Sequence, residues 1–192
     1  MPKSRRLSKA LSICVLILLV LNILAIPLIP GLVVLGREGG PLPVKLAGLF
    51  GPDSQDILFD MSPAGFFFFS LLEVWYNPAH AMLTAFLLIC ALCSALILWQ
   101  GLHVLRTVRD GLPFQRANER SLRFCAVCCF VMCGMAFVRC VWSCLYFHTL
   151  SPLFTYNALF IPVFLMAGLL LLVMASLFGQ AAELREENDL TI

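Results

Sequence analysis

Four apolar blocks divide the chain, and each is long enough to cross a lipid bilayer as a single helix. They cover residues 10–28, 79–101, 122–147 and 158–177. The hydrocarbon core of a bilayer is about 30 Å thick and takes about 20 helical residues to span. With 61% hydrophobic and 12% charged residues, the chain also carries more apolar side chain than one small soluble core can bury. The blocks therefore predict an all-α fold, an integral membrane four-helix bundle, formed by residues 1–192 as one membrane domain.

Helix boundary signals support these blocks. Asn77 before Pro78 is typical of an N-cap followed by proline in the first helical turn, and Asp110 before Gly111 is typical of a helix end. Asn157 precedes the fourth block. The first block exceeds the apolar region of a secretory signal, about 7 to 15 residues, and lacks an Ala-x-Ala site, so we expect it to remain as an anchor.

The distribution of positive charge predicts the orientation, because Lys and Arg are retained on the cytoplasmic side of a membrane. One set of flanks, the two tails and the stretch after the second block, holds ten: Lys3, Arg5, Arg6, Lys9, Arg106, Arg109, Arg116, Arg120, Arg123 and Arg185. The opposite side has only Arg37 and Lys45. Both termini are therefore expected to be cytoplasmic and residues 35–76 to lie outside, with an interfacial aromatic helix towards the end of that segment.

All nine cysteines fall inside the predicted spans: Cys14, Cys90, Cys93, Cys125, Cys128, Cys129, Cys133, Cys140 and Cys144. Two Cys-x-x-Cys pairs, one in the second block and one in the third, have the spacing of zinc half-sites. Five cysteines of the third block, however, follow one another at helical intervals, which is typical of a small-residue packing stripe in a membrane helix. Packing is the favoured interpretation, and neither a metal nor a cofactor is expected.

Arg139 is the one intramembrane charge that the sequence predicts well inside a span. Such a residue is a functional hypothesis by default. It lies about 12 Å from the outer end of its span, so its side chain can extend towards the surface or meet an acid of the outer segment. Anchoring and a solute or ion site both remain open, with anchoring favoured.

Two charged segments share the predicted cytoplasmic face, a basic elbow at residues 103–121 and an acidic tail at residues 180–192. The tail can dock on the elbow within one chain, can bind a partner, or can remain solvated, while the elbow can bind either anionic lipid or a partner. The predicted partner-docking residues are Arg106, Arg109, Pro113, Phe114, Arg116, Asn118, Arg120, Arg123, Glu186, Glu187, Asp189, Leu190 and Ile192.

The same segments carry a family resemblance. The elbow pattern Gly111-x-Pro113-Phe114-x3-Asn118-x3-Leu122-Arg123 and the ending 186–192, EENDLTI, resemble an uncharacterised bacterial family of small four-span membrane proteins, known only as a domain of unknown function. The resemblance covers residues 102–192, whereas residues 35–76 resemble no family that we can name. It implies four helices, a bacterial inner (plasma) membrane location and genes that often neighbour a small Cro/CI-type helix-turn-helix regulator. It implies no catalytic residues.

These features lead to three functional hypotheses, and enzymatic activity is not expected. The first is an interaction or signalling protein that docks a cytoplasmic partner, such as a small DNA-binding regulator, without contacting nucleic acid itself. The second is a small-solute carrier or channel subunit that uses Arg139. The third is a cofactor-bearing membrane redox protein, based on the cysteines and on His80 and His148 at the outer span ends. The cysteine stripe is equally compatible with packing within one chain and with a homo-oligomer in the bilayer.

Overall fold

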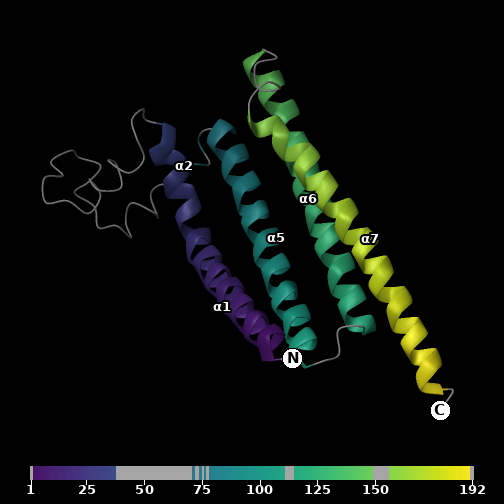
Figure 1. Cartoon of the computed structure of the whole chain (residues 1–192). Helices are drawn as coiled ribbons and strands as arrows, with labels where there is room; N and C mark the ends of the chain where they lie inside the picture. Colours follow the sequence, from purple (N-terminus) through teal and green to yellow (C-terminus); the bar gives the residue numbers. More distant parts are fainter. Residues whose placement is uncertain are drawn as a thin grey trace, which may run out of the picture. The chain divides into compact units, whose positions relative to one another are not determined.

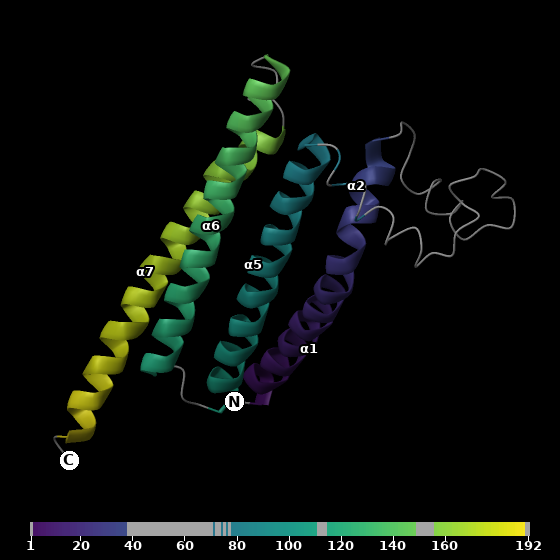
Figure 2. The same cartoon turned by 180° about the vertical axis from the view of Figure 1, so that it is seen from behind.

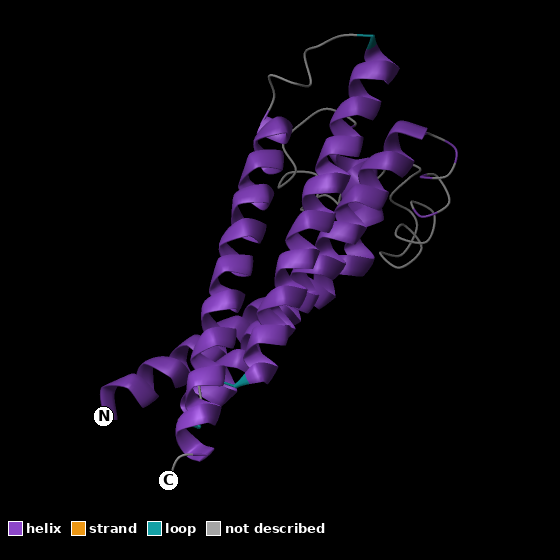
Figure 3. Ribbon diagram, turned by 90° about the vertical axis from the view of Figure 1, so that its right-hand side faces the viewer, coloured by secondary structure: helices purple, strands orange, loops and turns teal. Residues whose placement is uncertain are grey.

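A computed structural model describes residues 2–37, 71, 74, 76, 78–110, 115–148 and 156–190. These residues form α1 (Pro2–Ala25), the 3-10 turn η1 (Ile26–Leu28), α2 (Ile29–Arg37), α5 (Pro78–Arg109), α6 (Arg116–Phe147) and α7 (Tyr156–Leu190) (Figure 1). Figure 3 shows helices and no strand in this described part of the chain. The expected all-α fold is confirmed.

Four helical stretches are long and apolar enough to cross a membrane: Lys9–Val33, His80–Arg109, Arg116–Tyr146 and Ala158–Asn188. Each contains most or all of one predicted block. The helices nevertheless continue past the apolar residues, so that α5 has 32 residues, α6 has 32 and α7 has 35. At about 1.5 Å per residue these lengths reach about 48 to 53 Å, well beyond a hydrocarbon core of about 30 Å.

The first span changes from α-helix to 3-10 helix where its prolines remove backbone donors. Pro27 lies within η1, and Pro30 is the second residue of α2, which follows directly. Proline fits the first turn of a helix but cannot supply the hydrogen bond that a helix interior needs. The predicted span 10–28 therefore covers most of α1 and the 3-10 turn η1, and the helical chain continues beyond it as α2.

Helices α6 and α7 lie side by side and antiparallel, which Figures 1 and 2 show from opposite sides. Small residues of α7 face α6, since Ala175 is fully buried and Ala182 nearly so. Gly168 belongs to the same seven-residue series, and a Cβ built there would lie 3.0 Å from Cε1 of Phe130 on α6. Residues without bulky side chains at this spacing allow two membrane helices to approach closely.

The buried apolar cluster joins α5, α6 and α7. Its buried members are Cys93 of α5 and Cys128, Cys129 and Met132 of α6, and Phe164 and Leu171 of α7 pack against them. Of the four apolar stretches, that of α6 has the largest share of buried residues. In its apolar window 39% of the residues are buried, compared with 6% to 17% in the other three. Helix α6 is thus the central helix of this cluster.

The chain divides into two compact units, residues 1–22 with 89–192 and residues 23–88. The larger unit contains the cluster and the α6 and α7 pair. In the smaller unit the buried side chains include Ile29 and Val33 of α2, together with Val74 and Phe86. Most of the predicted outer segment, 35–76, and its aromatic residues 66–69 lie outside the described residues.

Candidate functional site

The basic elbow brings the end of α5 against the start of α6. Helix α5 ends at Arg109, directly before Asp110 and Gly111, as the sequence predicts, and the Asp110 amide donates to the carbonyl of Arg106 at 3.0 Å. Asn118, in the first turn of α6, is fully buried, and its Oδ1 accepts a hydrogen bond of 2.9 Å from the Thr107 hydroxyl of α5. A buried amide must be hydrogen-bonded to offset its lost hydration. Asn118 therefore fixes the register between the two helices.

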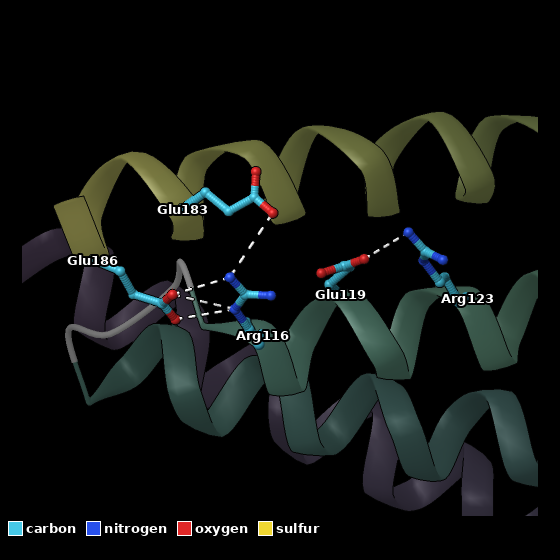
Figure 4. A network of polar contacts seen from close by, with 5 residues as sticks. All are labelled: Arg116, Glu119, Arg123, Glu183 and Glu186. Atoms are coloured by element: carbon cyan, nitrogen blue, oxygen red, sulfur yellow. Dashed lines mark hydrogen bonds and ion pairs between the residues drawn. The ribbon is translucent and has the colours of Figure 1, made fainter.

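The acidic end of α7 is bound to the start of α6 by Arg116. Its Nε and Nη2 donate to the Glu186 carboxylate at 3.0 to 3.2 Å, and Nη2 lies 3.8 Å from Oε1 of Glu183 (Figure 4). The forked geometry of a guanidinium matches a carboxylate in this way. All three side chains are more than half exposed, so salt screens the attraction. We call Arg116, Glu183 and Glu186 the clasp.

A second ion pair lies one turn further along α6. Glu119 accepts from Nη2 of Arg123 at 2.7 Å, and its side chain is only 18% exposed. A Cβ at Gly179 of α7 would be 2.9 Å from the Glu119 carboxylate, so the glycine leaves room for that carboxylate between the helices. Figure 4 shows this pair and the clasp along the facing sides of α6 and α7.

The structure places the predicted docking residues in three groups. Seven are exposed at the ends of α5, α6 and α7: Arg106, Arg109, Arg116, Arg120, Arg123, Glu186 and Glu187. Asn118 is buried and offers no surface to a partner in this arrangement. Pro113, Phe114 and Ile192 lie outside the described residues, as do the side chains of Asp189 and Leu190, whose backbone is helical.

Four contributors to this site were not among the predicted docking residues: Thr107, Glu119, Gly179 and Glu183. Three carry a sequence signal. Glu119 precedes Arg123 by four residues, Gly179 follows Ala175 by one helical turn, and Glu183 lies one turn before Glu186 and Glu187. Thr107 has no such signal, because a threonine near a helix end more often bonds its own backbone. It does so here as well, because its single hydroxyl proton is shared between the carbonyl of Val104, at 2.8 Å, and Oδ1 of Asn118.

Arg139 and the nine cysteines, which the sequence places inside the predicted spans, all lie on α1, α5 or α6. Arg139 is half-buried on α6, and its role stays a prediction. All nine cysteines are free, five of them are fully buried, and Cys133 donates to the carbonyl of Ile161 on α7 at 3.4 Å. Within the described ranges no group of three or more His, Cys, Asp or Glu residues is arranged to hold a metal ion. Cys93, Cys128 and Cys129 belong to the apolar cluster of α5, α6 and α7, and Cys90 packs against it, whereas Cys14 is exposed.

The model of a family described as a protein of unknown function, DUF2975, matches residues 15–192. The chain belongs to the DUF2975 family. The match is wider than the expected 102–192, because it includes the first span and residues 35–76. No curated protein and no solved structure is significantly similar to the chain. This DUF2975 member thus has four helices that are long and apolar enough to cross a membrane.

Proposed function

We propose that this protein is an interaction protein of the bacterial inner membrane that docks a cytoplasmic protein partner on its charged helix ends. The observation that carries the proposal is that the acidic tail is helical and is bound to α6. Residues 178–190 continue α7 as helix for about 20 Å, and the clasp ties this extension to the basic start of α6. A helix held in place loses less conformational entropy on binding than a disordered tail does.

The charge distribution supports a cytoplasmic position for this surface. Five arginines, at positions 106, 109, 116, 120 and 123, flank the inner ends of α5 and α6, and such residues favour the cytoplasmic side. Both termini are then cytoplasmic as well. A small helix-turn-helix regulator, which the family resemblance implies as a frequent gene neighbour, is the partner to test first.

The test is crosslinking in native membranes, followed by purification and mass spectrometry. The full chain is compared with a chain lacking residues 183–192, and with a full-length control in which Glu183 and Glu186 are both glutamine. We expect a soluble partner with the full chain, its loss on truncation, and reduced recovery with the double substitution, because the helix remains but its anchor to α6 is lost.

Recovery of the same soluble proteins from the full and the truncated chains would refute the proposal, as would recovery of none from either. Membrane abundance of the three chains is measured in parallel, so that a folding defect is not mistaken for loss of docking. If either refuting result is obtained, the carrier hypothesis is the next to test, by transport assays on Arg139→Gln.

A further inference from the structure

One face of α6 carries exposed apolar residues with an arginine at their head. Phe124, Val127 and Val131 are 42%, 56% and 44% exposed, and Arg120, one turn earlier, is exposed too. The intervals of four, three and four residues place these four side chains on one side of the helix. The buried residues Ser121, Cys125 and Cys128 lie on other sides. We call Arg120, Phe124, Val127 and Val131 the Arg120 face.

The depth of Arg120 matches that of a lipid phosphate. Phe124 begins the apolar part of α6, and Arg120 precedes it by four residues, or about 6 Å along the axis. The polar layer on each side of the hydrocarbon core is about 5 to 8 Å thick. Arg116, four residues earlier still, is about 12 Å from Phe124 and so lies beyond that layer, where Glu186 binds it.

Its neighbours leave Arg120 as the unbalanced positive charge of this face. Arg116 is bound by Glu186, and Arg123 is bound by Glu119. Within the described part of the chain, no hydrogen bond or ion pair holds Arg120. A guanidinium offers several N–H donors in a planar fork that suits the oxygens of a phosphate.

We propose that the Arg120 face is a binding site for one anionic phospholipid. The Arg120 guanidinium binds the phosphate of the headgroup, and one acyl chain lies along Phe124, Val127 and Val131. A net negative headgroup is preferred because it balances the charge that the two neighbouring ion pairs leave uncompensated. A zwitterionic lipid brings an ammonium or a choline group that offsets this attraction.

The experiment uses the full chain purified in mild detergent and titrated with phosphatidylglycerol or with phosphatidylcholine of the same acyl chains. Binding is followed by the rise in thermal unfolding temperature and by the lipid retained in native mass spectrometry. Arg120→Gln should weaken phosphatidylglycerol binding about fivefold, the effect of about one basic residue near an anionic surface, and Arg120→Lys should restore part of it. Arg185→Gln serves as the matched control, since Arg185 is exposed on α7 well beyond the apolar residues.

Four results would overturn the proposal. The first two are equal phosphatidylglycerol binding by Arg120→Gln and Arg185→Gln, and equal binding of the two lipids by the unmodified chain. The other two are an equal response to glycerol phosphate, which has no acyl chain, and a changed oligomeric state of Arg120→Gln with unchanged lipid binding. The last result assigns the Arg120 face to a second copy of the chain. Because Arg120 is exposed and touches no described partner, its substitution is not expected to disturb folding, and size-exclusion profiles check this. The outcome does not depend on the proposed docking function.

Discussion

Thr107→Val tests the hydrogen bond that joins the end of α5 to the start of α6. Valine keeps the shape of threonine but removes the hydroxyl that donates to Asn118 Oδ1 at 2.9 Å. Asn118 is fully buried, so its carbonyl oxygen loses this hydrogen bond at a position that bulk water does not reach. Removing one partner of a buried hydrogen bond costs about 1–3 kcal/mol. We therefore expect the free energy of unfolding to fall by about 2 kcal/mol.

Asn118→Ala should cost slightly more, about 2–3 kcal/mol, because it also leaves a small cavity. The Thr107 hydroxyl is not stranded by this change, since it still donates to the Val104 carbonyl. The double variant should then lose about 1 kcal/mol less than the sum of the two single variants, because the shared hydrogen bond is counted once.

The assay is equilibrium unfolding in mixed micelles with increasing dodecyl sulfate, followed by circular dichroism. Ser176→Ala is the control, because Ser176 is exposed on α7. If the two single effects add to within about 0.5 kcal/mol, Thr107 and Asn118 are energetically independent and the register argument is wrong.

Three further experiments test the packing and the clasp. Gly168→Leu should destabilise the α6 and α7 pair by about 1–3 kcal/mol, because the new side chain would meet the Phe130 ring. Gly101→Ala has open space around it and should stabilise α5 by about 0.5–1 kcal/mol. Equal shifts of the thermal unfolding temperature with the same sign would contradict the close approach of α7 to α6 at Gly168. Ser94→Ala removes the acceptor of the Asn22 amide on α1, 2.8 Å away, and should lower the free energy of unfolding by about 0.6 kcal/mol; an unchanged value would show that this bond contributes no net stability. Arg116→Gln should release the end of α7 and speed tryptic cleavage after Arg185, as should high salt in the unmodified chain; the same rate for Arg116→Gln and Arg109→Gln would show that the clasp does not hold the helix.

The positions of the four spans could be predicted from sequence because apolarity over about 20 residues leaves few alternatives. Capping chemistry located the α5 boundaries closely, at Pro78 and at Arg109 before Asp110 and Gly111. Helix α7 was predicted to span the membrane only to residue 177, yet it continues to Leu190. Hydropathy detects the membrane part of a helix, whereas the backbone continues through residues 180–187, which are mostly strong helix formers.

The candidate site was predicted less completely, because its geometry depends on how distant segments meet. The basic elbow and acidic tail were recognised by charge, and docking of the tail on the elbow was among the alternatives. That Arg116 is the arginine that binds Glu186 could not be deduced, since five arginines were available and the choice depends on the register of α6 against α7. Asn118 illustrates the opposite limit: an amide among arginines is expected on the surface, yet it is buried between helices.

The antiparallel arrangement of α6 and α7 also implies an order of assembly. The contact between Cys133 and Ile161 joins residues 28 apart in the chain, whereas that between Arg116 and Glu186 joins residues 70 apart. Closing the longer loop first would cost more chain entropy, so pairing that starts near Cys133 and Ile161 and proceeds towards the clasp is favoured. During synthesis Glu186 also emerges after every other described partner of α6. Closure of the clasp therefore marks the moment at which the two helices are paired along their whole length.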